Sequence, residues 1–395
     1  MSLYDKLGLL ITPNGVAPSK IFAYKPTNGS GDGVFDRNTT ATRVNSAGLI
    51  ENVAIDVARI NYPNNGSCPH LLLEPQSTNL ETTSASGSYG NPPSSEILTI
   101  APDGTNEAVR PVPDGNSDRY QFTTIGGTYS SGDKVTYSWY RKRFSTPINV
   151  SFIGDLKINT LSNCTQIGGT EQIETNINGY DRFEAIFSIT DGSLNSILRF
   201  YFGSIIGAGN SSISYWGHQL EEGLYATSYI PTNGSAVTRV QDVANNFGDV
   251  NTFNSEEGTL FVEMAALSND SVIEGLSLSD GGITERIVIF KWNTSNTYRF
   301  RLVTGGNQYD FSFTVPDITA SNKLAFCWNN GNVSVYVNGI EEDSTALGYS
   351  FVANTLNGFQ FDGGNGTSKF KGKVKQVQVY KEALTDAQLI TLTTI

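Results

Sequence analysis

Aromatic side chains that lie out of phase with the buried face of a strand are the residues of this sequence best suited to surface chemistry. Tyr140 and Tyr201 lie opposite alternating apolar residues in two such stretches. Trp292 and Tyr336 lie opposite apolar residues in stretches nearer the carboxyl end. Asn338, two residues after Tyr336, lies on the same face of its strand. An exposed ring beside amide groups suits the C–H faces and hydroxyls of sugars. We expect weak carbohydrate binding, most of all at Trp292 with Tyr336. The alternative is that these rings cover a second sheet or a subunit contact.

Catalytic groups are sparse in this chain. His70 and His218 are its two histidines, and no GxSxG motif accompanies them. Glu221 and Glu222 are adjacent, so on a strand they point to opposite faces and cannot act as a pair. We therefore expect no enzyme activity. A polysaccharide depolymerase, which needs two carboxylates about 5–9.5 Å apart across a cleft, is the less favoured alternative.

Calcium is the one metal for which the sequence offers ligands. Asp280, Asp362 and Asn365 lie in glycine-rich loops and carry the hard oxygen donors that calcium prefers. Asp and Asn also form turns, so these residues are weak candidates for a calcium site. The three cysteines are far apart and form no CxxC pair, which argues against zinc and against a disulfide framework. No cofactor is expected beyond this possible Ca²⁺.

The composition excludes several classes of partner. The chain has 26 basic and 38 acidic residues, a net charge of −12, and no basic stretch suited to nucleic acid. No run of about 20 apolar residues predicts membrane insertion. The first residues lack the pattern of a signal peptide, so we expect synthesis in a cytoplasm.

A strand-and-turn pattern dominates the chain and predicts an all-β fold of tandem antiparallel β-sandwiches. In the last third, Leu324, Phe326 and Trp328 alternate as one buried face. A hairpin is predicted at Asn329-Asn330-Gly331, between the strands Leu324–Trp328 and Val333–Val337, because Asn and Gly tolerate the positive φ of a tight turn. One short helix is predicted near the carboxyl end, where Thr385 and Gln388 form a capping box. It must be stabilised by packing against a sheet.

Four lysines alternate before that helix and form a basic stripe on an acidic protein: Lys369, Lys371, Lys373 and Lys375. The stripe indicates either an edge strand protected by its lysines or a surface that contacts an acidic glycan or a neighbouring subunit.

Polar, Pro- and Gly-rich stretches divide the chain into three parts. Residues 1–80 form an extended amino-terminal region that packs on the middle domain or anchors the protein. Residues 81–246 form a sandwich that resembles carbohydrate-binding modules. Residues 247–395 form a jelly roll closed by the short helix.

Two sequence blocks resemble tailed-bacteriophage virion proteins. The first runs from Phe35-Asp36-Arg37-Asn38 through Arg59-Ile60-Asn61-Tyr62 to Leu71–Leu80, and the second from Tyr215–Gly223 through Thr227–Thr232 to Thr238–Asp242. The last third is similar to concanavalin/laminin-G-like domains, as its Val377–Leu389 segment shows.

The resemblance implies a structural protein of the virion, a tail or head fibre component whose lectin-like sandwiches attach to host surface polysaccharide. It implies a homo-oligomer, with a trimer as first expectation, and contacts with other virion proteins. A decoration protein without a ligand is the alternative. The expected subunit contact lies in the amino-terminal region, at Leu7, Leu9, Leu10, Ile11, Ile21 and Phe22.

Overall fold

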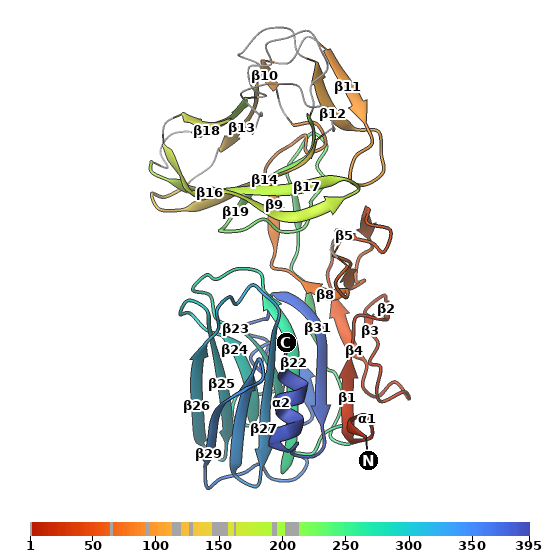
Figure 1. Cartoon of the computed structure of the whole chain (residues 1–395), viewed down its shortest axis with the longest axis vertical. Helices are drawn as coiled ribbons and strands as arrows, with labels where there is room; N and C mark the ends of the chain where they lie inside the picture. Colours follow the sequence, from red (N-terminus) through yellow and green to blue (C-terminus); the bar gives the residue numbers. More distant parts are fainter. Residues whose placement is uncertain are drawn as a thin grey trace.

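The chain folds as two β-sandwiches stacked along its longest axis (Figure 1). The computed structural model describes residues 2–63, 66–87, 89–91, 95–112, 120–125, 129–143, 157–161, 163–191, 196–201 and 213–395. Within them, only the backbone is described for 89–91, 95, 111–112, 120–125, 143, 157–161, 168–171, 196–201 and 213. All paired strands run antiparallel in these ranges, apart from one isolated parallel bridge, so the all-β prediction is confirmed.

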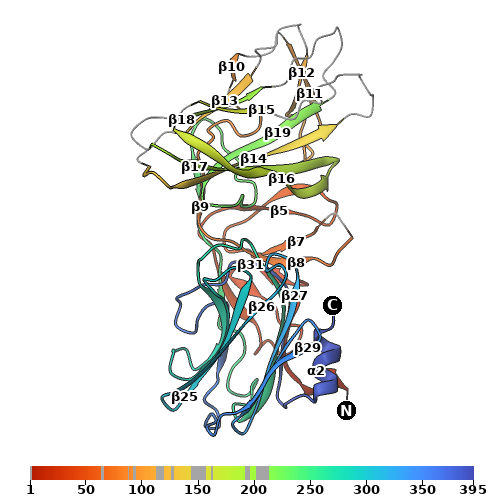
Figure 2. The ribbon, with the colours of Figure 1, turned by 60° about the vertical axis from the view of Figure 1, so that its left-hand side comes forward.

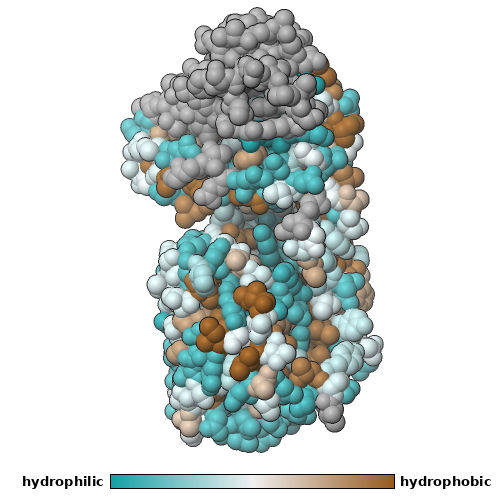
Figure 3. All heavy atoms as spheres, in the orientation of Figure 1, coloured by the Kyte–Doolittle hydropathy of each residue, from teal (hydrophilic) through white to brown (hydrophobic). Residues whose placement is uncertain are grey.

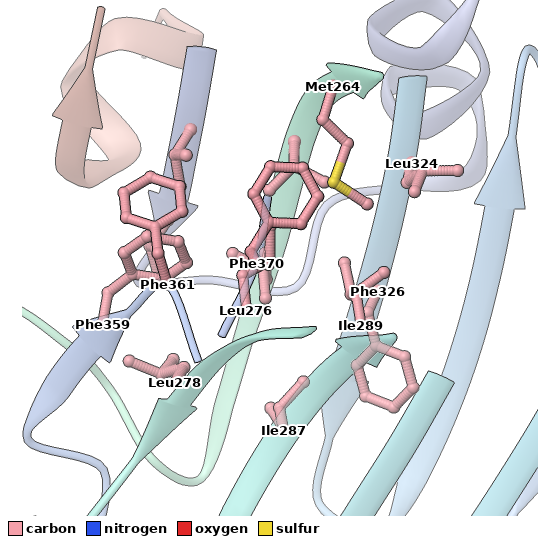
Figure 4. Packing of buried hydrophobic residues seen from close by; sticks show 14 of the residues in the cluster. Met264, Leu276, Leu278, Ile287, Ile289, Leu324, Phe326, Phe359, Phe361 and Phe370 are labelled. Atoms are coloured by element: carbon pink, nitrogen blue, oxygen red, sulfur yellow. The ribbon is translucent and has the colours of Figure 1, made fainter. Parts of the chain in front are cut away.

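The carboxyl-terminal sandwich faces two sheets across one apolar core (Figure 4). The larger sheet has the order β29 (Ile340–Ala346), β28 (Asn332–Val337), β27 (Asn322–Asn329), β22 (Glu257–Ala266), β31 (Gly372–Tyr380), β8 (His70–Leu73) and β7 (Arg59–Asn61). The smaller sheet has the order β26 (Asn307–Thr314), β25 (Thr297–Thr304), β24 (Arg286–Lys291), β23 (Glu274–Ser279) and β30 (Gly358–Gln360). Strands such as β22, β25 and β27 send alternate side chains into the core, as the period of two predicts.

The predicted hairpin joins β27 to β28. Asn329 pairs with Asn332, and between them Asn330 has φ 44° and Gly331 has φ 84°. Two consecutive positive φ values define the two-residue turn whose twist matches that of the strands. The hairpin predicted from Asn329-Asn330-Gly331 is confirmed, with Asn329 as the last residue of β27 and the other two residues in the turn.

Most of the amino-terminal region is part of the carboxyl-terminal sandwich. Strand β1 (Leu7–Ile11) pairs with β31, and β7 and β8 extend the same sheet. Leu9 and Ile11 enter the shared core, together with Ile21 beside them. The expectation that Leu7, Leu9, Ile11 and Ile21 make subunit contacts is therefore wrong, since each is at most 6 % exposed within one chain.

Short strands complete this amino-terminal layer, which lies beside β31 in Figure 1. One small sheet joins β2 (Val16–Ala17), β3 (Lys20–Ile21), β4 (Gly33–Asp36) and β21 (Val243–Asn245). The hairpin of β5 (Ala41–Val44) and β6 (Ile50–Val53) packs on the middle sandwich through Val44 and Ile50. Asn79, near the end of the same region, also contacts this sandwich, because its Oδ1 accepts from the Leu220 N–H at 3.1 Å. The amino-terminal region is thus divided: these residues contact the middle sandwich, whereas β1, β7 and β8 belong to the larger carboxyl-terminal sheet.

The middle sandwich also consists of two sheets, which stand above the amino-terminal layer in Figure 2. One has the order β11 (Ser95–Thr99), β12 (Ala108–Val112), β19 (Ile213–Glu222), β14 (Lys134–Arg143), β17 (Tyr180–Ile189) and β16 (Cys164–Ile177). The other has the order β10 (Tyr89–Asn91), β13 (Tyr120–Ile125), β18 (Ser196–Tyr201) and β15 (Lys157–Leu161). A two-stranded ribbon of β9 (Ser77–Asn79) and β20 (Val237–Arg239) joins this sandwich to the one below.

Two helices occur in the described ranges, α1 (Leu3–Lys6) and α2 (Asp386–Thr393). The predicted cap of α2 is present, because the Gln388 side chain accepts a bond from the Thr385 N–H at 3.1 Å. Helix α2 packs through Leu389 on the outer face of the larger sheet. Across the described part of the chain, no helix has the length and apolar character needed to span a membrane.

Candidate functional site between the two sandwiches

Tyr336 is buried, and its expected role as an exposed ring is wrong. Its side chain is 0 % exposed and packs with Tyr380, Leu384 and Leu389. The alternation predicts the two faces of β28 correctly, since Val335 and Val337 face the inter-sheet core on the other side of the strand. Helix α2 covers the outer face that the alternation left open, so Tyr336 offers no surface to a ligand.

Tyr140 is buried for a similar reason, and its expected exposure is also wrong. The centre of its ring lies 5.5 Å from that of Trp216 and 6.5 Å from that of Tyr229. These rings belong to a cluster that includes Val44 of the β5–β6 hairpin. The amino-terminal layer covers this outer face of β14. Tyr201 lies on β18, where its side chain is outside the described residues.

Trp292 directly follows β24 in the smaller sheet, whereas Tyr336 and Asn338 belong to the larger one. The structure therefore does not bring Trp292 and Tyr336 together. Trp292 is half-buried, and the guanidinium of Arg299 lies 3.5 Å from the centre of its ring. Asn338 lies in the turn after β28 with a positive φ of 50°, and its Oδ1 accepts from the Lys323 N–H at 2.9 Å.

The three calcium candidates act as turn formers in this structure. Asp280 Oδ1 accepts from the Gly282 N–H at 2.8 Å, and Asp362 Oδ1 accepts from the Gly364 N–H at 2.7 Å. Asn365 Oδ1 accepts from the Thr367 hydroxyl at 2.6 Å. Among the described residues, no three His, Cys, Asp or Glu side chains gather as a metal site. Calcium binding stays a prediction.

A cleft of about 590 Å³ lies between the two sandwiches. Figure 3 shows the molecule narrowing between its two halves, with a notch at the left. The volume falls within the range of about 300–1,000 Å³ typical of small-molecule sites. Three parts of the chain contribute to the walls: the amino-terminal layer (among others Arg43, Tyr62, His70), the middle sandwich (Gln172, Glu174, Arg182, Glu184, Tyr225) and the carboxyl-terminal sandwich (Ser268, Thr319, Lys373).

Two half-buried rings, Tyr62 and Tyr225, stand in the walls of the cleft. Burial, together with the nearby carboxylates of Glu274 and Asp270, raises the pKa of the Tyr225 hydroxyl well above its ordinary value. This hydroxyl therefore stays protonated at all physiological pH values. The rings provide apolar faces, and their hydroxyls provide hydrogen-bonding groups beside them.

A buried network of five charged side chains adjoins the cleft, which Glu74 of this network lines. Arg59 Nη1 donates to Glu74 at 2.6 Å, and Arg37 Nη1 donates to Asp242 at 3.1 Å. Arg59 also pairs with Asp242, and Arg239 pairs with Glu74. All five side chains are at most 4 % exposed. We call these five residues the ionic junction.

The ionic junction brings the two sequence blocks together in space. Arg37, Arg59 and Glu74 belong to the first block, and Arg239 and Asp242 to the second. Glu74 also accepts bonds from the backbone N–H and hydroxyl of Ser228, both at 2.7 Å. The two blocks thus meet in space and fix the segment after β19 that carries Tyr225.

The two histidines are buried and neutral. His218 lies on β19, where its Nδ1 bonds the Tyr137 hydroxyl at 2.7 Å, and burial lowers the pKa of His218 to about 3. Burial, with the charges of Lys373 and Lys375, lowers the pKa of His70 to about 3 as well. Neither imidazole can accept a proton near neutral pH.

The lysine stripe does not mark an edge strand. Lys373 and Lys375 lie on β31, which has β22 on one side and β8 and β1 on the other. Lys375 pairs with Glu263 at 3.0 Å, and Lys371 lies 3.8 Å from Glu274. Lys373 is exposed and reaches the cleft.

The alternation of strand faces does not predict four residues of the cleft: Tyr62, Tyr225, Glu174 and Arg182. Their common signal is position, since Tyr62 belongs to the first sequence block and Tyr225 lies inside the second, between Gly223 and Thr227. Treating the two blocks as neighbours in space would have placed both tyrosines at one junction. No sequence signal distinguishes Glu174 and Arg182 from other alternating polar residues of a sheet.

Comparison with known proteins supports the fold of the last third. Residues 247–390 match the concanavalin A-like lectin/glucanases superfamily. The sequence matches no curated protein.

Two solved structures are among those with a similar chain path. The CBM40 of the Ruminococcus gnavus IT-sialidase, bound to α2,3-sialyllactose, is 21 % identical over 36 % of this chain and 84 % of its own, with a TM-score of 0.31. Domain 4 of AbnA, a GH43 arabinanase from Geobacillus stearothermophilus in complex with arabinotriose, is 18 % identical over 43 % of this chain and 82 % of its own, with a TM-score of 0.33. The carboxyl-terminal part of this chain, residues 247–390, is similar to concanavalin A-like lectins and glucanases, and its fold is a lectin-like β-sandwich.

Proposed function

We propose that this chain is a structural protein of a bacteriophage virion, a tail or head fibre component that binds host surface polysaccharide in the cleft between its sandwiches. The observation that carries the binding proposal is the cleft itself, with two tyrosine rings and several polar side chains around about 590 Å³. The lectin-like fold of residues 247–390 supports carbohydrate as the ligand. The two sequence blocks support the virion role through their resemblance to phage proteins.

The proposed action is binding without catalysis. Both histidines are neutral at physiological pH, because the pKa of each lies near 3. Glu184 accepts from the Ala226 N–H at 2.7 Å, and one of the two carboxylate oxygens of Glu174 accepts from the Tyr140 hydroxyl at 3.0 Å. The proposal needs no cofactor.

Tyr225→Ala should weaken binding of purified host envelope polysaccharide by at least about tenfold, because a buried aromatic anchor contributes about 2 kcal/mol or more. Titration calorimetry measures the dissociation constant, and thermal melting checks that the fold is intact. Tyr24→Ala is the matched control, since Tyr24 is 52 % exposed and lies outside the cleft. Wild-type affinity in both Tyr225→Ala and Tyr62→Ala would exclude the cleft as the binding site.

An antibody against this chain should label the virion surface in electron micrographs. Sedimentation of the purified protein should show a closed homo-oligomer, with a trimer as the first expectation, because weak glycan sites become effective when several bind together. Unlabelled virions would contradict the virion role. A monomer both in solution and on the particle would contradict the multivalent mechanism.

A further inference from the structure

Arg182 is a buried charge without an ion pair among the described side chains. The residue is 2 % exposed, and its Nη2 donates to the Ser138 hydroxyl at 3.0 Å. Its Nε has no hydrogen-bond partner in the described part of the chain, and its guanidinium lies 5.2 Å from the ring of Tyr140. A buried guanidinium with so few bonds destabilises the fold. Because Arg182 also lines the cleft, its open bonding capacity points to a ligand.

Two carboxylates flank Arg182 on the same wall. Glu174 of β16 is its cross-strand partner on β17, and Glu184 follows two residues later on the same face. Glu174 Oε2 accepts from the Tyr140 hydroxyl, while its Oε1 receives no bond from any described residue. Burial lowers the pKa of Arg182, but Tyr140, Glu174, Glu221 and Glu184 outweigh it and keep the guanidinium charged.

The charges around the cleft balance. Among the residues that the structure describes, three cations (Arg43, Arg182, Lys373) and three carboxylates (Glu74, Glu174, Glu184) line it. Arg43 is paired with Glu51 at 2.7 Å, and Glu74 belongs to the ionic junction. An anionic ligand therefore gains little net attraction, and it would approach Glu174 and Glu184 directly.

The donor and acceptor pattern suits hydroxyl groups. A guanidinium only donates hydrogen bonds and a carboxylate only accepts them, whereas a hydroxyl does both. Neighbouring hydroxyls of a sugar can accept from Arg182 and donate to Glu174 at the same time. A carboxylate or sulfate on the ligand satisfies Arg182 but leaves Glu174 opposed by a like charge.

We propose that the cleft selects neutral, polyhydroxylated glycans over acidic ones, and that Arg182 and Glu174 bind a pair of neighbouring hydroxyls. This inference rests on the proposed carbohydrate-binding function and names the class of ligand. Tyr225 and Tyr62 provide the apolar surface on which the sugar rings lie.

The test compares neutral and acidic polysaccharides on the intact chain. Dextran, mannan and galactan represent neutral glycans, and polygalacturonate and alginate represent acidic ones. At least one neutral polymer should bind more tightly than both acidic polymers. Its affinity should change by less than about twofold between 50 and 500 mM NaCl, because no ion pair joins it to the protein.

Glu174→Gln isolates the acceptor role. Glutamine keeps the shape and can still accept from Tyr140, but it removes the charge that binds a sugar hydroxyl. Neutral-glycan binding should fall by about tenfold or more, as for a lost hydrogen bond to a charged group. Glu341→Gln is the control, since Glu341 is an exposed carboxylate on β29 outside the cleft.

The proposed selectivity would be overturned if polygalacturonate or alginate bound more tightly than every neutral polymer and if Glu174→Gln strengthened that binding further. If Tyr225→Ala abolishes that acidic binding, the cleft remains a carbohydrate site and the proposed function stands. Absence of binding to all five polymers and to host polysaccharide would reject both proposals.

Discussion

Glu74→Gln is expected to lower the free energy of unfolding by about 3–5 kcal/mol, because it leaves buried guanidinium groups without their partner. Arg59 and Arg239 both bond Glu74, and neither side chain is more than 1 % exposed. Ser228 loses a charged acceptor as well. Chemical denaturation monitored by tryptophan fluorescence measures the effect.

Glu51→Gln is the matched control, because Glu51 pairs with Arg43 at 2.7 Å at the surface. Exposed pairs of this kind contribute about 1 kcal/mol or less. Equal costs for the two variants would show that the ionic junction does not stabilise the arrangement of the sandwiches.

The effect of Glu74→Gln on the free energy of unfolding should depend on pH. Burial alone would raise the pKa of Glu74, but Arg239 and Arg59 hold it well below its ordinary value of 4.5. Stability from this carboxylate is therefore complete above about pH 5 and is lost as the pH falls below the ordinary value. The two buried histidines make the folded protein less stable as the pH falls below 6.5, and they do so in wild type and in Glu74→Gln alike. The difference between wild type and Glu74→Gln should thus shrink only below about pH 5.

Trp328→Ala should cost about 3–5 kcal/mol, the range for removing a large buried aromatic side chain. Trp328 is 3 % exposed on the inner face of β27, and its Nε1 donates to the Ser255 carbonyl at 2.9 Å. Gly258 packs so closely on the indole that a Cβ there would lie 2.5 Å from it. Denaturation of the variant measures the cost.

Trp292→Ala provides the comparison within the same sandwich. Trp292 is half-buried and packs on Arg299 and Phe290, so its removal opens no enclosed cavity. Its cost should be clearly smaller than that of Trp328→Ala. A cost under about 1 kcal/mol for Trp328→Ala would mean that the core closes around the missing side chain.

The sequence by itself determined the features that depend on local chemistry. Alternation of period two placed Trp328 in the core and Val335 opposite Tyr336, because successive side chains of a strand point to opposite faces. Asn330 and Gly331 determined a turn, since both tolerate positive φ. Gln388 and Thr385 determined where α2 begins. Each of these features involves residues a few positions apart.

Only the tertiary structure decided which outer faces remain open. Tyr336 and Tyr140 lie on the faces that alternation predicted, but α2 covers one face and the β5–β6 hairpin covers the other. The packing also brings Glu74 to Arg239, 165 positions away, and brings Tyr62 and Tyr225 to one cleft. Periodicity reports the two faces of a strand but not what packs on them, because that depends on contacts between distant segments. The cleft exists only where those segments meet.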